Sequence, residues 1–292
     1  MRRVSIADKG GMEIKHKEMQ WRSDDGEPLL AGQWEPDSEV KGVICLVHGH
    51  GEHSGRYRHW AERLAGAGYA MLAIDLRGHG KSGGKRGDTP TFDHFSDDIN
   101  LMLDEARREF KDIPCFLYGH SMGGLLALFC LIQRRPLLNG AVITSPLLHS
   151  VYDHKQYLTA MISFFSRIIP GLSISSNLEV DALAQDPAVI YAYRSDPLVH
   201  DRATLRLGKG LLDTIEYIFN RAGEIKLPLL IMHGTEDRIN HASGSEKLAG
   251  LVSGDCTLEL WESLYHELHN EEEKDEVFAC LKNWLDSKLS SP

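Results

Sequence analysis

Paired cysteines are missing from this sequence. Its five cysteines are an odd number among 292 residues, and no CxxC motif occurs. A disulfide framework or a structural zinc site needs paired spacing, so we expect small buried cysteines in a reducing compartment. The histidines and acids also lack metal-ligand spacing, apart from a loose H-x-x-H at 266–269. The sequence therefore predicts neither a metal nor another cofactor.

The sequence also lacks an excess of positive charge. It has 32 Lys and Arg against 42 Asp and Glu, which gives a formal net charge of −10. Nucleic-acid binding and strong binding to anionic membranes both require a basic surface. The acidic balance argues against both kinds of partner, although it does not bear on neutral lipids.

No apolar run is long enough to cross a bilayer. The most apolar long segment, YLTAMISFFSRIIPGL at 157–172, is too short and contains Arg167 and Pro170. The first 21 residues lack the apolar core of a signal peptide. We therefore expect a cytoplasmic protein.

The sequence does contain a regular alternation of strands and helices. Residues 12–35 alternate polar and apolar around DDGEP, which predicts a hairpin. Strands are predicted at 41–49, 69–75, 113–119, 140–146, 227–234 and 256–262, and the first of these is a continuous apolar run that fits burial on both faces. Helices are predicted at 59–68, 95–110 and 123–135, and near 243–253 and 270–289.

This alternation predicts a mostly parallel, doubly wound α/β sheet. It stops between residues 147 and 222, where helical stretches occur without a clear buried strand. We therefore expect a core made of 1–146 and 223–292, with a helical cap inserted at 147–222.

The stretch YGHSMGGLLALFC, at 118–130, places Ser121 where a predicted strand gives way to a helix. A sharp turn there strains the serine backbone, and Gly119 and Gly123 remove the Cβ atoms that would collide. The start of the helix also favours developing negative charge. G-x-S-x-G is a short pattern and can be a simple turn, but in this context it predicts a nucleophilic serine.

A serine hydroxyl needs a base, and the base needs an orienting carboxylate. In folds with this turn the chain order is serine, acid, histidine. The loop after the penultimate strand offers Glu236 and Asp237, and Asp237 is favoured because it lies further past the strand end. His266 and His269 follow the last strand, and we take His266 as the base. Asp75 is the main rival acid, but it precedes the serine.

An ester-cleaving serine also needs N–H donors for the oxyanion of the tetrahedral intermediate. The first is expected from the backbone of Met122, directly after the nucleophile. The second is expected from the backbone of His50, within the loop HGHGEH at 48–53. The alternative is that this loop is a glycine-rich turn and nothing more.

Taken together, these motifs resemble the α/β-hydrolase superfamily, and more narrowly its monoacylglycerol lipase and lysophospholipase branch. The matching stretches are HGHGEHSGRY (48–57), DLRGHGKSGG (75–84), GHSMGG (119–124), SDPLV (195–199), HGTEDRI (233–239) and YHELHNE (265–271). The resemblance implies an α/β-hydrolase fold with an inserted helical cap. It also implies that Ser121, Asp237 and His266 form the catalytic triad, and that His50 and Met122 form the oxyanion hole.

The same resemblance implies a polar pocket for a glycerol headgroup, lined by Glu52, Arg56 and His269. From the residues alone, Glu52 and Arg56 would instead be surface charges. His50 departs from the branch, in which this position is usually small. Its imidazole could narrow the site or bind a polar headgroup, which leaves the substrate open but not the reaction type.

The expected activity is hydrolysis of the carboxylic esters of lipids, with monoacylglycerol as the expected small-molecule substrate. The alternatives are a lysophospholipase, a short- or medium-chain carboxylesterase, a peptidase, or a ligand sensor on a retired hydrolase fold. The apolar segment 157–172 would line an acyl site, pack against the core, or bring the cap into transient contact with a membrane surface. The oligomeric state is left open.

Overall fold

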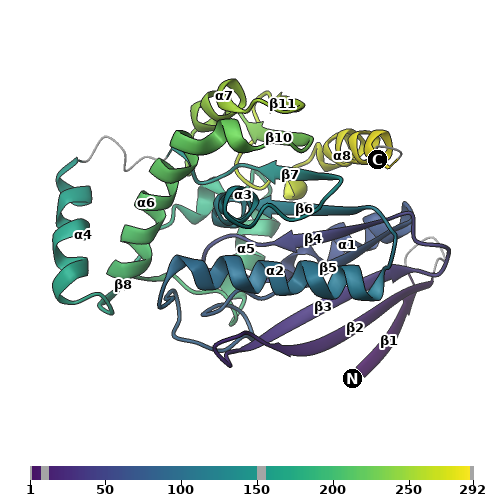
Figure 1. Cartoon of the computed structure of the whole chain (residues 1–292), viewed down its shortest axis with the longest axis horizontal. Coiled ribbons are helices and arrows are strands. Elements are labelled where there is room, and N and C mark those ends of the chain that lie inside the picture. Colours follow the sequence, from purple (N-terminus) through teal and green to yellow (C-terminus); the bar gives the residue numbers. More distant parts are fainter. Residues whose placement is uncertain (1, 8–12, 150–155, 290–292) are drawn as a thin grey trace.

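The computed structural model describes residues 2–7, 13–149 and 156–289. A nine-stranded sheet forms its centre, with the strand order β1-β2-β3-β5-β4-β6-β7-β10-β11 (Figure 1). The antiparallel strands at one edge are β1 (Arg2–Ala7), β2 (Glu13–Arg22) and β3 (Pro28–Pro36). The strands β5 (Tyr69–Ile74), β4 (Gly42–Val47), β6 (Cys115–His120), β7 (Gly140–Thr144), β10 (Leu229–Gly234) and β11 (Cys256–Trp261) run parallel.

The predicted hairpin and all six predicted strands are present, with ends shifted by up to two residues. Five of the six are fully buried, whereas β11, at the edge of the sheet, is only partly buried. The sequence did not predict β1. It pairs only with β2, at the edge of the sheet, and its first two residues are charged, so no apolar run marks it.

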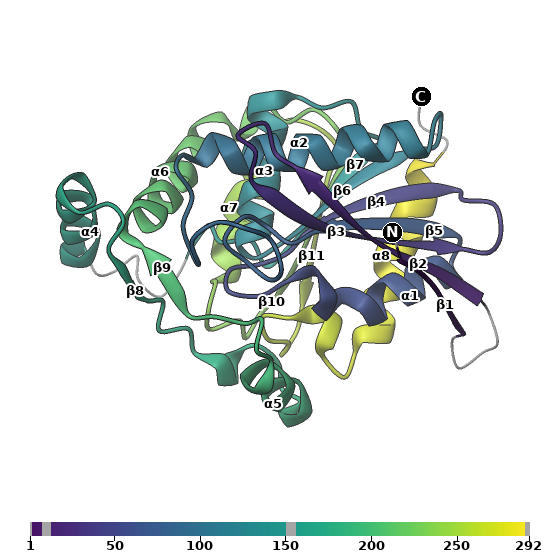
Figure 2. The same cartoon turned by 90° about the horizontal axis from the view of Figure 1, so that it is seen from below.

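Helices cover both faces of the sheet because its strands alternate their side chains between two apolar layers. In β4, Val43 and Cys45 point into the layer under α2 (Phe92–Glu109), α3 (Met122–Arg134) and α7 (Ala242–Leu251). Ile44 and Leu46 point into the layer under α1 (Arg58–Gly66) and α8 (Lys274–Lys288). Figure 2 shows α2 and α1 on opposite sides of the sheet.

Among the described residues, three α-helices lie between β7 and β10, in the stretch where the sequence predicted the cap. They are α4 (Gln156–Ile168), α5 (Pro187–Ser195) and α6 (Leu205–Arg221). A short antiparallel ribbon of β8 (Ser173–Ser175) and β9 (Arg202–Thr204) accompanies them. It was not predicted, because three-residue strands outside the core carry no buried run. The predicted limits of the cap, 147 and 222, remain an interpretation.

Helix α4 stands at the outer edge of the molecule, with α6 between it and the sheet (Figures 1 and 2). Its inner side packs on α6, where Ile162 lies beside Gly208. Within the described residues, every helix is too short or too polar to cross a membrane.

The parallel strands bring four loops to one edge of the sheet. β4 ends at Val47, β6 at His120, β10 at Gly234 and β11 at Trp261. Ligands of such sheets gather where the carboxyl ends of strands meet. All the site residues that the sequence predicts lie in the segments that directly follow these strand ends.

Candidate active site

Ser121 occupies a strained turn between β6 and α3. Its backbone angles are φ 55° and ψ −121°, a conformation that non-glycine residues rarely adopt. An added Cβ at Gly119 would collide with Ala127 and the backbone of α3. One at Gly123 would overlap the carbonyl oxygens of Val47 and His48. Both glycines therefore let the turn close as the sequence predicts.

Asp237 and His266 form a buried pair in the loops after β10 and β11. The Nδ1 atom of His266 lies 2.6 Å from Oδ2 of Asp237. The carboxylate cannot donate, so this nitrogen carries the proton and Nε2 is free to accept one. Burial lowers the pKa of His266, but the charge of Asp237 and its hydrogen bond outweigh burial, and the net pKa is raised.

Each carboxylate oxygen of Asp237 has two hydrogen-bond partners. Its Oδ1 accepts from the N–H groups of Ile239 at 2.8 Å and Asn240 at 2.9 Å. Its Oδ2 also lies 3.1 Å from Nε2 of His233. Burial raises the pKa of Asp237, but the charge of His266 and hydrogen bonds from both histidines bring it below its usual value. The carboxylate is thus held ionised and fixed in orientation.

His266 lies beside His120, the residue that precedes Ser121. The His266 ring is 4.8 Å from the ring of His120, centroid to centroid. The backbone carbonyl of His266 accepts from Ser145 Oγ at 2.8 Å, while the N–H of Ser121 donates to Thr144 at 3.0 Å. These bonds tie the loop that carries His266 and the turn that carries Ser121 to the C-terminal end of β7.

The two expected oxyanion donors are the backbone N–H groups of Met122 and His50. Met122 is the first residue of α3, and His50 stands in the loop after β4. Among the described residues, neither backbone N–H has a hydrogen-bond partner. Both are therefore available to an oxygen atom of a ligand.

Asp75, the rival acid, is engaged elsewhere. Its Oδ1 accepts from the N–H and hydroxyl of Ser54, at 2.9 and 2.6 Å, and its Oδ2 accepts from the N–H of Lys81 at 2.8 Å. The carboxylate thus ties two loops together.

Two of the three residues predicted to bind a headgroup, Glu52 and Arg56, belong to a buried ion network with Glu267. Arg56 makes a bidentate pair with Glu267, at 2.6 and 2.8 Å, and also donates to Oε2 of Glu52 at 2.5 Å. The Oε1 of Glu52 accepts from the N–H of Gly49 at 2.7 Å and from the hydroxyl of Tyr57 at 2.8 Å. The structure thus joins Glu52 and Arg56 to the oxyanion loop and to the residue after His266.

His269 and His50 are less well satisfied. Both ring nitrogens of each are buried without a hydrogen-bond partner among the described residues. His269 stacks on Tyr57, with ring centroids 4.6 Å apart, and burial brings its pKa well below the usual value. His50 packs against His79 and His200, at 5.4 and 5.6 Å between ring centroids. Burial, followed by the charges of His200 and His48, lowers the pKa of His50 to about 4.

Three residues near the site were not singled out from the sequence. His233 and Asn240 lie on either side of Asp237, and Glu267 directly follows His266. Their positions next to predicted triad members were the only signal. Buried polar side chains look like surface residues in a sequence, since burial depends on the loops packed around them.

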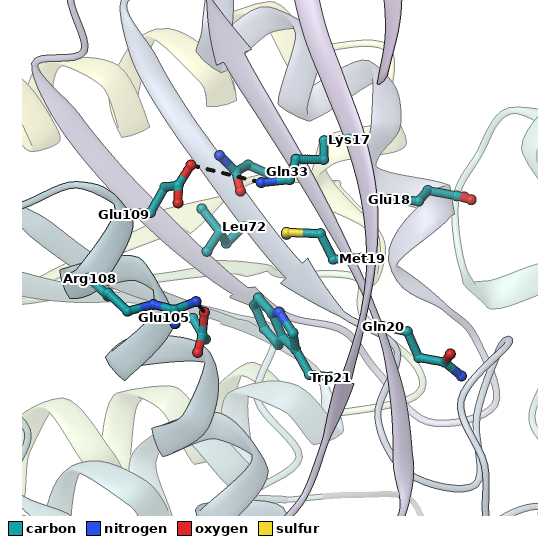
Figure 3. A pocket seen from close by; sticks show the side chains of 10 residues that line it. All are labelled: Lys17, Glu18, Met19, Gln20, Trp21, Gln33, Leu72, Glu105, Arg108 and Glu109. Carbon is teal, nitrogen blue, oxygen red and sulfur yellow. Dashed lines mark hydrogen bonds and ion pairs between the residues drawn. The ribbon is translucent and has the colours of Figure 1, made fainter. Parts of the chain in front are cut away.

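A surface cavity of about 440 Å³ lies away from the predicted triad, between β2, β3 and α2 (Figure 3). Its floor is apolar, with Met19, Trp21 and Leu72. Two ion pairs stand among the charged side chains that line it, Lys17 with Glu109 at 3.8 Å and Arg108 with Glu105. Among the described residues, no cluster of histidine, cysteine or acidic side chains could hold a metal ion.

Comparison with known proteins identifies the family. Residues 38–273 match the Hydrolase_4 family, described as serine aminopeptidase, S33. A monoacylglycerol lipase from Mycolicibacterium smegmatis is 34% identical over 267 residues, which are 90% of this chain and 95% of that protein. An uncharacterized abhydrolase domain-containing protein from Dictyostelium discoideum is 34% identical over 91% of this chain, which spans only 28% of that longer protein.

A solved structure agrees with these relatives. The crystal structure of Paleococcus ferrophilus monoacylglycerol lipase superimposes with a TM-score of 0.82 and 35% identity, covering 89% of this chain and 99% of that one. The expected fold and superfamily are therefore confirmed. The chain belongs to the Hydrolase_4 (serine aminopeptidase, S33) family and has the α/β-hydrolase fold.

Proposed function

We propose that this protein is a serine hydrolase that cleaves carboxylic esters of lipids, with monoacylglycerol as its substrate. The observation that carries the proposal is the buried Asp237–His266 pair, whose histidine packs on His120, the residue before a serine in a strained turn. Relatives named monoacylglycerol lipase, similar over most of both chains, support the lipid ester as the substrate class.

The acylation step follows from the tautomer of His266. Its Nε2 takes the proton of Ser121 as Oγ attacks the ester carbonyl carbon. Asp237 stabilises the imidazolium that forms. The N–H groups of Met122 and His50 bind the oxyanion. The intermediate then collapses: the bond to the glycerol oxygen breaks, that oxygen receives the proton from His266, and the acyl group stays on Ser121.

Water completes the cycle. His266 accepts a proton from a water molecule, whose oxygen attacks the acyl carbon. The second tetrahedral intermediate expels Oγ of Ser121, which regains a proton from His266, and the fatty acid is released. No cofactor takes part in these steps.

Exposed apolar side chains on α4, in the predicted cap, also support a lipid substrate. Tyr157, Met161, Phe164 and Ile168 follow helical spacing along α4, and each is more than half exposed. Leu172 and Ile174 continue this apolar surface past the helix. Because these side chains are exposed, they are better suited to contact a membrane that contains the substrate than to form the inner wall of an acyl site.

The test is a comparison of kcat/KM across substrates, with Ser121→Ala as the blank. We expect 1-monooleoylglycerol and medium-to-long 4-nitrophenyl esters to be turned over better than 4-nitrophenyl acetate. Preference for a lysophospholipid would favour the phospholipase alternative, and cleavage of aminoacyl p-nitroanilides would favour a peptidase. Turnover of short esters alone would overturn the lipid assignment, and no labelling of Ser121 by a fluorophosphonate would overturn the serine hydrolase.

A further inference from the structure

Asn240 is a fully buried polar residue between the acid loop and the serine. Its backbone N–H donates to Oδ1 of Asp237. Its side-chain Nδ2 donates to the backbone carbonyl of Ser145 at 2.8 Å and lies 3.5 Å from Oγ of Ser121. The Oδ1 atom of Asn240 is buried without a partner in the described part of the chain.

The contacts fix which way the amide points. With Nδ2 facing Ser145 and Ser121, the amide has two acceptors in front of its donor group. The reversed amide would place its oxygen against the Ser145 carbonyl and turn its N–H groups toward a place that offers no acceptor. The donor therefore faces the nucleophile.

The hydroxyl of Ser121 has one proton to give and two lone pairs to accept with. If Nδ2 occupies one lone pair, the proton is left for Nε2 of His266 and the second lone pair for the carbonyl carbon. We propose that Asn240 directs the Ser121 proton toward His266 and stabilises negative charge on Oγ while that proton leaves. This inference deepens the proposed function and rests on it.

The length of the contact fits such a role. A separation of 3.5 Å is a weak hydrogen bond in the resting protein. Contacts at catalytic groups are often long without substrate and shorten in the transition state. Because charge-assisted hydrogen bonds are shorter and stronger than neutral ones, the bond gains strength as Oγ becomes anionic and again when Oγ is expelled in deacylation.

The unpartnered Oδ1 atom of Asn240 also supports a functional role for this residue. A buried amide that leaves an acceptor unsatisfied is costly to the folded state, and an apolar side chain of similar size would avoid that cost. Sites that break this rule tend to be functional. An apolar residue would lose both contacts of Nδ2, the hydrogen bond to the carbonyl of Ser145 and the contact with Oγ of Ser121.

The experiment compares Asn240→Ala and Asn240→Leu with wild type. The leucine refills the space without a donor, and Asn100→Ala, on an exposed part of α2, is the matched control. We expect kcat for a 4-nitrophenyl ester and the fluorophosphonate labelling rate to fall about tenfold in both Asn240 variants, with KM unchanged. Asn240→Asp places a carboxylate beside Oγ of Ser121, and this carboxylate competes with His266 for the Ser121 proton. We therefore expect the fall in kcat to be about tenfold larger than in the other two variants, and to grow as the carboxylate ionises.

A merely structural role gives a different pattern. If Asn240 were only structural, its replacement would disturb the Asp237–His266 pair, whose Nδ1 proton gives a downfield resonance in the proton NMR spectrum. Under our proposal, this resonance is unchanged in the variants. Loss of the resonance together with activity, or kcat within twofold of wild type in both variants, overturns the inference. Labelling of wild type at Ser121 tests the proposed function separately, since the inference concerns only the ratio of rates.

One further measurement needs no variant. Phosphonylation turns Oγ of Ser121 into an ester oxygen, which is a poorer acceptor. The side-chain amide resonances of Asn240 are then expected to shift more than those of Asn100. Unchanged Asn240 resonances would contradict the contact.

Discussion

Asp237 and His266 are 29 positions apart in the chain, yet Oδ2 of one and Nδ1 of the other are 2.6 Å apart. The neighbouring parallel strands β10 and β11 end at the same edge and deliver both side chains there. His233 and the N–H groups of two loop residues hold the carboxylate from its other sides. The pair is thus pre-organised before any substrate binds.

Asp237→Asn is expected to lower kcat about 10³- to 10⁴-fold, because the amide no longer favours the tautomer with a free Nε2 or stabilises the imidazolium. Glu236→Gln is the matched control, since Glu236 is the neighbouring acid of the same loop but is exposed. Ester turnover by the two variants measures the difference. Equal losses in both, or a larger loss for Glu236→Gln, would move the triad acid to Glu236.

The pH dependence of kcat/KM should show an acid limb set by His266. The base works only when it is neutral, and Asp237 raises its pKa above the ordinary value of 6.5. Activity therefore falls as the pH drops through a pKa above 6.5, and it is fully present above that pKa. A titration of ester turnover from pH 5 to pH 9 tests this. An acid limb below 6.5 would contradict the raised pKa.

Gly123→Ala should destabilise the protein, because the new Cβ would overlap the carbonyl oxygens of Val47 and His48. Backbone groups yield poorly, so we expect about 3 kcal/mol less free energy of unfolding, and loss of the serine turn with it. Gly250→Ala in α7 is the control, since an added Cβ there meets nothing within 4 Å. That change is expected to stabilise by about 0.5–1 kcal/mol. Denaturant unfolding of both variants measures the contrast.

The sequence predicted the parallel sheet and the loops of the site well, for a physical reason. Strands buried on both faces appear as continuous apolar runs, and the residues that follow them must gather at one edge. Ser121 and Asp237 come shortly after such strands, β6 and β10, while His266 follows β11, an edge strand that is only partly buried. Strand β1 and the β8–β9 ribbon have no such run, so neither was predicted.

Charged residues that are buried in the fold were harder to identify from the sequence. Glu52 and Arg56 looked like surface charges, and only a family resemblance suggested a role for them. Their burial comes from Glu267, which is more than two hundred positions away in the sequence and supplies the bidentate partner. A pairing that depends on how distant loops pack leaves no local pattern.

Arg56→Met separates a structural from a headgroup role for this network. The change leaves two buried carboxylates facing each other without their cation, and we expect the free energy of unfolding to fall by about 3–5 kcal/mol. Arg58→Met is the control, because its pair with Glu62 is largely exposed and should be worth about 0–1 kcal/mol. Denaturant unfolding measures both. A raised KM for monooleoylglycerol with unchanged stability would favour the headgroup pocket instead.

The apolar face of α4 gives the last prediction. Phe164 is 58% exposed and Ile168 is 61% exposed, on the same side of a helix at the outer edge of the molecule. Replacing both with serine removes apolar area that a neutral membrane would bury, so binding to phosphatidylcholine vesicles should weaken about tenfold. Turnover of dissolved 4-nitrophenyl acetate should stay the same.

Leu137→Ser is the matched control, because Leu137 is 87% exposed but lies on the core, between α3 and β7. Vesicle sedimentation and turnover of vesicle-borne monooleoylglycerol measure the effect. Because the net charge is −10, attraction to anionic lipid cannot replace the lost apolar contact, and adding phosphatidylserine should weaken binding further. Equal vesicle binding by wild type and the double variant would show that this face serves another purpose than membrane contact.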